Sequence, residues 1–272
     1  MRGNRRQLGT RHFCAAAFLA LLALSIPPDS MAQQPADLLE RTSDRVAKFL
    51  DQFSDVKCTE QVTQEKFKPD GKLALKEEST FDYLVILTNS NGELSLNESR
   101  LPVRQGKADK NKNISMLVSN GFATLFLVFH PYYFRSFEFS DAGPDTLDGR
   151  AVEKVVFHHV SGMRSPAALA LRGREFPLEL AGTAWIDAKT AQLERIEAGV
   201  NQGLEDIGMK SLHSEISFAP VAFRDAKENY WFPSIATVEV ETPRQHWRNT
   251  HRFTDYKQFS VSTEEKVADN ER

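Results

Sequence analysis

The stretch Lys210–Phe218, with the sequence KSLHSEISF, gives a clear indication of the fold class. Its apolar residues Leu212, Ile216 and Phe218 alternate with the polar residues His213, Glu215 and Ser217, which is the period of a β-strand with one buried and one solvated face. The same alternation recurs in Tyr230–Thr242 and in Gln245–Val261. A sheet with one apolar face and one wet face is typical of antiparallel strands that are packed on a single side.

Further strand patterns lie outward from this stretch, about 10–15 residues apart and without helices between most of them, which favours an antiparallel meander over βαβ units. They are Cys58 onward, Thr80–Thr88, a short piece at Glu93–Leu96, Tyr132–Phe139, Ala151–Val160, Gly182–Asp187 and Gln192–Val200. Two helices are expected. Ala36–Phe53 has one apolar stripe at helical spacing, and Ile114–Phe129 is apolar nearly all round. The composition of elements predicts an α+β fold that is mainly antiparallel β.

The N-terminus has the parts of a cleavable signal peptide. Four arginines precede the uncharged apolar run Phe13–Ile26, which is shorter than the roughly 20 residues that span a bilayer as a helix. Two prolines follow, and Ser30-Met31-Ala32 supplies the small residues of a cleavage site. We therefore predict a signal peptide over residues 1–32, cleaved near Ala32, and a periplasmic or secreted bacterial protein. Arg5-Arg6 leaves both the general secretory route and the twin-arginine route open.

The remaining chain is expected to form one domain, residues 33–263, followed by a disordered tail at 264–272. Cys14 precedes the apolar run of the leader, so it is not placed like a lipidated cysteine, and no later run reaches membrane-spanning length. The mature chain is thus expected to have no transmembrane anchor. Cys58 would be its only cysteine, for which we expect the role of a small buried apolar residue.

Charge argues against nucleic acid as a partner. The formal net charge is −3 at pH 7, with signs interspersed along the chain, and loss of the arginine-rich leader makes it more negative. Polyanion-binding proteins instead gather basic residues on one face.

The chain offers no constellation for catalysis. His158 and His159 are adjacent on a predicted strand and therefore point to opposite faces, as do His246 and His251, so neither pair can share a metal ion. His130 stands at a helix end, where the helix dipole favours a cation. No metalloprotease, redox, nucleophile-elbow or phosphate-loop motif is present. The prediction is a non-enzymatic protein with no catalytic residues, no metal and no cofactor.

The apolar face of the sheet leaves two possibilities open. In one, the helices and the curvature of the sheet close a dry core. In the other, the sheet curls into a half-barrel whose apolar lining is only partly plugged, and a cleft remains for an acyl chain.

One region resembles a known family. Gly182–Thr190 (GTAWIDAKT) leads into Leu193–Glu197 (LERIE), and Trp231–Ser234 (WFPS) and Phe253–Tyr256 (FTDY) follow in the same order of turns and strands. This pattern resembles the periplasmic lipoprotein-carrier superfamily (LolA/LolB-like). The resemblance implies a signal peptide, a curved half-barrel sheet with covering helices, and an apolar cavity for acyl chains.

Together these features predict a non-enzymatic periplasmic protein that binds a hydrophobic ligand, such as a lipid or a lipoprotein acyl chain, in the concavity of the half-barrel. The alternative is an envelope protein-interaction or sensor module with the same fold and no lipid-carrier activity. The residues expected to line the concavity are Phe81, Tyr83, Val85, Trp185, Ile196, Leu212, Ile216, Val238, Val240 and Trp247.

Overall fold

The computed structural model describes residues 29–90, 93–103, 125–171, 174–200, 208–223 and 229–258. Almost all of the predicted signal peptide, most of the predicted helix Ile114–Phe129 and the predicted tail lie outside these residues. No helix of the described part of the chain is both long and apolar enough to cross a membrane.

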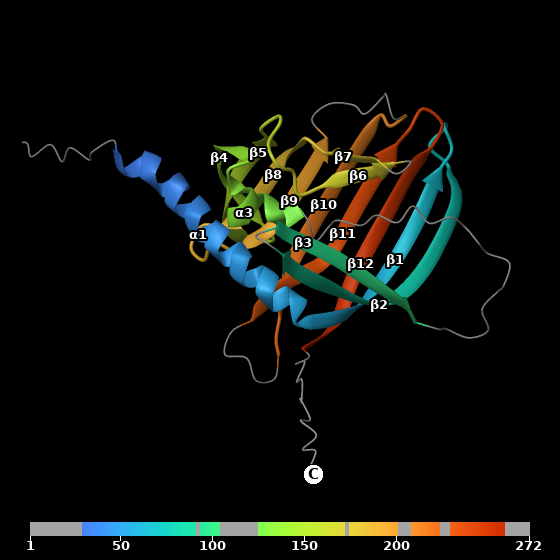
Figure 1. Ribbon diagram of the computed structural model, residues 1–272, viewed down its shortest axis with the longest axis horizontal. Coiled ribbons are helices and arrows are strands. Elements are labelled where there is room, and N and C mark those ends of the chain that lie inside the picture. The colour runs from blue at the N-terminus through green and yellow to red at the C-terminus, as the bar shows by residue number, and fades with distance from the viewer. Residues whose placement is uncertain are drawn as a thin grey trace, which may run out of the picture.

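A large antiparallel sheet dominates the molecule (Figure 1). The helical elements are α1 (Asp29–Ser54), η1 (Phe126–Phe129, a 3-10 helix) and α3 (Pro131–Phe134). The strands are β1 (Val56–Phe67), β2 (Leu73–Ser90), β3 (Glu93–Pro102), β4 (Phe137–Leu147), β5 (Arg150–His159), β6 (Ala168–Leu171), β7 (Arg174–Pro177), β8 (Leu180–Asp187), β9 (Leu193–Val200), β10 (Ser211–Val221), β11 (Tyr230–Glu241) and β12 (His246–Gln258).

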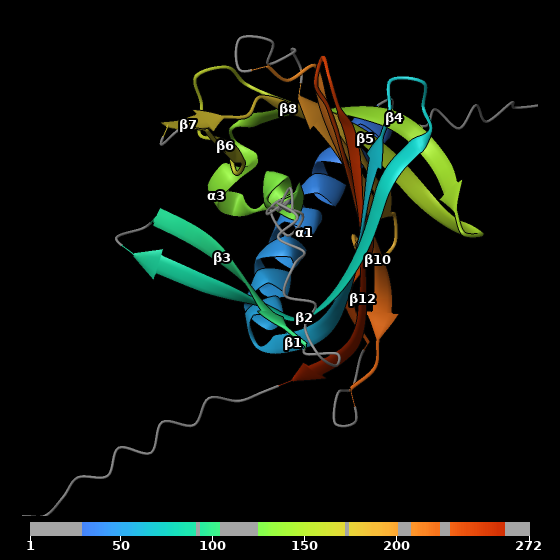
Figure 2. The same cartoon turned by 90° about the vertical axis from the view of Figure 1, so that its right-hand side faces the viewer.

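Ten strands form the sheet in the order β3-β2-β1-β12-β11-β10-β9-β8-β5-β4, and β6 and β7 form a separate hairpin. Most neighbours are also consecutive in the chain, but β1 pairs with β12, which brings the two ends of the domain together. The sheet curves strongly without closing, so that β3 and β4 remain as edges (Figure 2). The predicted mainly antiparallel half-barrel with covering helices is confirmed.

Tight turns fix the register of the hairpins. Asp148 and Gly149 form the two-residue turn between β4 and β5 with φ of 50° and 78°. Two successive positive φ angles match the right-handed twist of a hairpin, and Asp-Gly is a favoured sequence there. A turn around Gly71, whose φ is 78°, likewise joins β1 to β2.

Helix α1 lies inside the curve of the sheet. In Figure 2 it runs between the long strands β10 and β12 on one side and the β2–β3 hairpin on the other. The predicted apolar stripe of the helix is the face that is buried, with Leu38, Val46, Phe49, Leu50 and Phe53. Thr42 and Ser43 fill the turn between Leu38 and Val46 on the same buried face. The helix begins at Asp29, earlier than the predicted Ala36.

Two local predictions are corrected. Tyr132–Phe139 is not one strand, because the short helix α3 precedes β4. Pro131 sets the backbone angle of the first helical position, and the His130 side chain accepts a hydrogen bond from the Tyr132 amide. β3 extends well beyond the predicted strand Glu93–Leu96, as far as Pro102.

Candidate functional site

Nine of the ten predicted lining residues lie on the concave face. Cross-strand pairing places Ile196 opposite Ile216, and Val240 opposite both Leu212 and Trp247. Directly opposed residues of neighbouring strands point to the same face of a sheet. Six of the nine are buried (Tyr83, Val85, Ile196, Ile216, Val238 and Val240), and three are partly buried (Phe81, Leu212 and Trp247).

Trp185 does not belong with them. Its strand neighbours Ala184 and Ile186 are completely buried on the concave side, so Trp185 points to the convex side. There its ring lies under the Arg195 guanidinium at 4.9 Å, and its indole nitrogen donates to Asp145 at 3.1 Å. The strand was predicted correctly, but the lining residues of β8 are the small and branched neighbours of the tryptophan.

Aromatic side chains of α1 and η1 fill the space above the apolar part of the concave face. The Phe49 ring lies 4.8 Å from that of Phe126 and 6.0 Å from that of Phe218, and Phe53 stacks on Phe232 at 5.7 Å. Beside them a crevice of about 10 Å³ remains, room for about one water molecule. In the described residues, this part of the half-barrel is therefore packed with side chains rather than open.

The remaining part of the concave face buries charge. Glu60 on β1 is fully buried, accepts two hydrogen bonds from Arg100 on β3 (2.6 and 3.0 Å) and contacts His251 on β12 at 2.8 Å. Arg100 also binds Glu98 at 2.9 Å and lies over the Tyr83 ring at 5.1 Å. This cluster ties the edge strand β3 to β1 and β12 across the curl of the sheet.

The environment of this cluster shifts its pKa values. Burial raises the pKa of the Glu60 carboxyl, but hydrogen bonds from His251 and Arg100 outweigh it, and the pKa lies below the usual 4.5. Burial lowers the pKa of His251 below 6.5 despite the neighbouring carboxylate. At neutral pH the cluster thus holds charged Glu60 and Arg100 beside a neutral imidazole.

Sequence reasoning missed this cluster, although a signal was present. His251 stands in phase with Trp247 and Phe253, on the apolar side of its strand. Glu60 likewise occupies the inward phase of β1. A charged or polar residue at the buried phase of a strand requires a partner, because an unpaired buried charge is costly.

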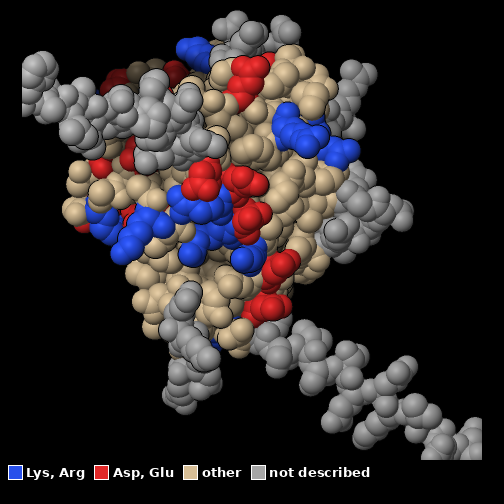
Figure 3. All heavy atoms as spheres, turned by 90° about the vertical axis from the view of Figure 1, so that its left-hand side faces the viewer, with Lys and Arg blue, Asp and Glu red and all other residues tan. Residues whose placement is uncertain are grey.

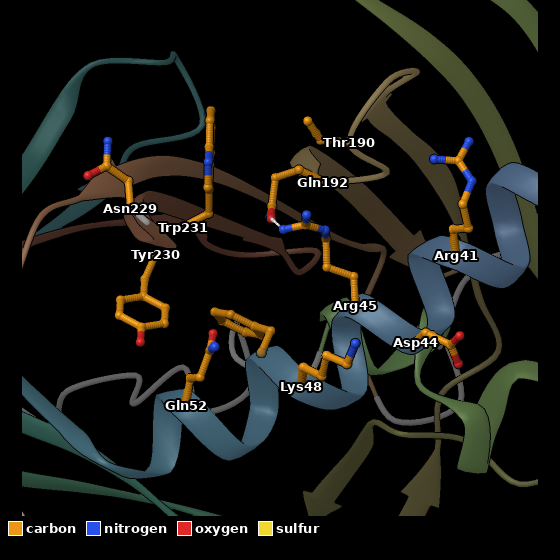
Figure 4. A pocket seen from close by; sticks show the side chains of 11 residues that line it. Arg41, Asp44, Arg45, Lys48, Gln52, Thr190, Gln192, Asn229, Tyr230 and Trp231 are labelled. Atoms are coloured by element: carbon orange, nitrogen blue, oxygen red, sulfur yellow. Dashed lines mark hydrogen bonds between the residues drawn. The ribbon is translucent and has the colours of Figure 1, made fainter. Parts of the chain in front are cut away.

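A groove runs along one side of α1, between the helix and the rim of the sheet (Figure 4). Its volume is about 400 Å³, within the roughly 300–1,000 Å³ of typical ligand pockets. The helix contributes three basic side chains, and the rim contributes amides and aromatic rings. The lining residues are Arg41, Asp44, Arg45, Lys48, Phe49, Gln52, Thr190, Gln192, Asn229, Tyr230 and Trp231.

The groove adjoins the small apolar crevice. Both are lined by Arg45, Phe49 and Gln192, and the crevice continues inward to Phe126 and Phe218. A polar and basic groove therefore lies directly beside the aromatic packing under α1, with these three side chains between the two spaces.

The histidines considered as candidates from the sequence make contacts within the fold. His158 is exposed against Glu138 at 2.9 Å, whereas His159 is buried, so the predicted opposite orientation is confirmed. Burial lowers the pKa of His130, whose side chain accepts a hydrogen bond from the Tyr132 amide at the start of α3. No group of three potential metal ligands occurs in the described ranges.

Cys58 has the predicted role of a small buried residue. Its exposed fraction is 2%, and burial raises the pKa of the thiol to about 12. A thiol with so high a pKa is a poor nucleophile at neutral pH.

No family model matches the chain, and no curated protein does. Solved structures with a similar course of the chain include a domain from Vibrio parahaemolyticus named for outer membrane lipoprotein sorting. It is 8% identical, with a TM-score of 0.45, over 83% of this chain and 94% of that one. A DUF1329 family protein from Desulfovibrio piger is 10% identical, with a TM-score of 0.43, over 84% and 94%.

A third similar structure is a LolA superfamily protein from Nitrosomonas europaea, 10% identical with a TM-score of 0.38, over 84% of this chain and 94% of that one. Identities and TM-scores of this size carry no function from one protein to another. The chain is thus similar to structures that include a member of the superfamily its turn-and-strand pattern resembles.

Proposed function

We propose that this protein is an exported, non-enzymatic binding protein for an amphiphile, whose apolar chain lies between α1 and the concave face of the sheet. The observation that carries this proposal is that the groove and the crevice lie side by side. The two share Arg45, Phe49 and Gln192, so only these side chains separate a ligand in the groove from the apolar packing beneath the helix.

The energetics favour an acyl chain as the apolar part. Each buried methylene contributes about 0.8 kcal/mol, so a chain of moderate length gains affinity without specific polar contacts. The crevice at rest is too small for such a chain, and entry requires the rings of Phe49 and Phe126 to give way. Both rings belong to covering elements, not to the hydrogen-bonded sheet, and can move without breaking strand pairing.

The proposed setting is the bacterial periplasm, reached by the signal peptide of residues 1–32 and cleavage near Ala32. The mature domain would then carry a lipid or a lipoprotein acyl chain through an aqueous compartment. The nine predicted lining residues on the concave face, Trp185 excluded, would form the wall of the site once the rings of Phe49 and Phe126 have moved aside.

Native mass spectrometry with monooleoylglycerol, an uncharged single-chain amphiphile, tests the proposal. We expect a one-to-one complex of the chain with the lipid. Phe126→Ala removes a ring that closes the crevice, and we expect it to increase occupancy while lowering stability by about 3–5 kcal/mol. Absence of a complex for both proteins would overturn the proposal.

Phe157→Ala is the matched control. Phe157 is as deeply buried as Phe126 but packs against Phe129 and Phe137, away from the crevice. The expected loss of stability is similar, about 3–5 kcal/mol, with no gain in lipid occupancy. Equal gains in the two variants would show that lipid binds to loosened protein in general.

The second candidate is an envelope interaction or sensor module with the same fold. It is favoured by the filled concave face, where Phe49, Phe53 and Phe126 occupy the space an open carrier would leave for its ligand. Failure of both the parent chain and Phe126→Ala to bind lipid would leave this candidate.

A further inference from the structure

The three basic side chains of α1 all line one groove. Arg41, Arg45 and Lys48 are the only basic residues of the helix, and they follow one another at spacings of four and three residues. Such spacing places them on one side of the helix. Of the four acidic side chains described on α1, only Asp44 lines the groove, whereas Asp37, Glu40 and Asp51 do not.

The rim of the sheet holds two of these cations in place. Arg41 pairs with Asp37 at 2.8 Å and donates to the carbonyls of Lys189 and Ala188 at 3.3 and 3.4 Å. Arg45 reaches across the groove and donates to the Gln192 side chain at 3.4 Å (Figure 4). A charged stripe on a solvated helix has no such partners on a second element.

Two charges remain available to a ligand. Neither Arg45 nor Lys48 has a carboxylate at ion-pair distance among the residues that the structure describes, whereas Arg41 is partly neutralised by Asp37. The chain as a whole has a formal net charge of −3, opposite in sign to this basic site. Figure 3 shows the corresponding side of the molecule, where basic side chains gather in a patch bordered by acidic ones.

Aromatic rings with polar edges complete the wall. Tyr230 and Trp231 line the groove opposite the helix (Figure 4), and the Trp231 ring is braced by the Arg150 guanidinium at 4.6 Å. Arg150 is itself held by the buried Glu194 at 3.0 Å. Tyrosine and tryptophan suit the boundary between lipid headgroups and acyl chains, because each has an apolar body and a polar edge.

We propose that the groove binds the phosphate-bearing headgroup of an anionic amphiphile, held by Arg45 and Lys48, with the acyl chain directed into the adjoining crevice. This inference rests on the proposed function and adds the chemistry of the headgroup. Phosphate suits the site because guanidinium groups bind its oxygens in pairs, and a cationic site favours its negative charge.

Titration of the full chain with three soluble probes tests the proposal, with binding followed by calorimetry. The probes are dihexanoyl phosphatidylglycerol, dihexanoyl phosphatidylcholine and glycerol 3-phosphate. We expect the phosphatidylglycerol to bind roughly tenfold more tightly than the zwitterionic lipid, and glycerol 3-phosphate to compete with it only weakly. Glycerol 3-phosphate binding as tightly as phosphatidylglycerol would overturn the proposal in favour of a free phosphate ester.

Substitutions locate the effect. Arg45→Gln with Lys48→Gln is expected to abolish the preference for phosphatidylglycerol, and Asp44→Asn to raise its affinity about threefold. Arg244→Gln with Lys257→Gln removes the same charge at two exposed positions outside the groove, and should leave the preference unchanged. All substituted side chains lie at the surface of the fold or in the groove, and circular dichroism is expected to show unchanged folding.

The two proposals fail differently. Equal binding of the two lipids, unaffected by Arg45→Gln with Lys48→Gln, would overturn the headgroup site while leaving acyl-chain binding in place. Absence of binding by monooleoylglycerol and by both phospholipids would instead overturn the proposed function itself. Binding of phosphatidylglycerol that is lost equally in the Arg244 and Lys257 control would reduce the effect to overall charge and overturn the assignment.

Discussion

The concave surface of the sheet has an apolar half on β8–β10 and a charged half on β1, β3 and β12. In the apolar half Ala184, Ile196 and Ile216 are completely buried and packed under helix and aromatic side chains. In the charged half, Glu60 is equally buried but is held by Arg100 and His251. The difference shows two ways to hold one curved sheet: shape filling where a helix covers it, and ion pairing where the edge hairpin curls over.

Gly182→Ala should cause the largest loss of stability, because it disrupts strand packing in the apolar half. A Cβ there would lie 1.9 Å from the Glu197 carbonyl oxygen and 2.9 Å from the Ala198 Cα, and backbone cannot yield as a side chain can. We expect the free energy of unfolding to fall by more than about 4 kcal/mol, measured by denaturant unfolding. Gly199→Ala, whose Cβ would lie 3.0 Å from the Leu212 oxygen, is the milder control; equal losses would contradict the prediction.

Arg100→Met should have the second-largest effect, because it removes the central cation of the charged half. It leaves Glu60 and Glu98 buried without their cation, for which we expect a loss of about 3–5 kcal/mol. Arg195→Met is the matched control on the convex side, where the arginine also binds two carboxylates, Glu197 and Glu215, but in more exposed positions. Its loss should stay below about 1 kcal/mol in the same assay, so similar values would show that burial does not distinguish the halves.

Acidification should destabilise the charged half of the concave face. The pKa of His251 and that of Glu60 are both lower in the folded protein than the usual 6.5 and 4.5, so the unfolded chain binds more protons. Stability is therefore fully present above pH 6.5 and falls as the pH drops, first through His251 and then through Glu60. His251→Gln should flatten the upper part of this fall in pH-dependent unfolding; an unchanged slope between pH 6.5 and 4.5 would contradict the assignment.

Trp185→Phe should have the smallest effect, because it acts on the convex face. It removes the hydrogen bond to Asp145 and weakens the contact with Arg195, both in partly solvated positions. We expect a loss of about 0.5–1 kcal/mol by thermal unfolding. A loss as large as that of Arg100→Met would mean that the tryptophan supports the core.

Period-two patterns predicted most strands well, because most inward residues of β10 and β11 are apolar, as at Ile216 and Val238, and most outward ones are polar, as at Glu215 and Glu239. They failed at Trp185, where a large apolar ring lies on the outer face and small residues fill the inner one. They also failed at Pro131, since a run of aromatic residues is compatible both with a strand and with a short helix such as α3. The type of a side chain indicates only its average burial. Its actual burial in this protein depends on the residues that it contacts in the folded sheet.

The sequence by itself determined the antiparallel sheet, the amphipathic α1 and the turns at Gly71 and Gly149, because each follows from local period and backbone preference. Only the tertiary structure decided that β1 pairs with β12, that Arg100 meets Glu60 across the curl, and that Arg45 faces Gln192 across a groove. These contacts join residues far apart in the chain, and their partners are chosen by the curvature of the sheet. The period of the sequence specifies the face of the sheet on which a residue lies, but the curvature of the sheet specifies which residues it contacts there.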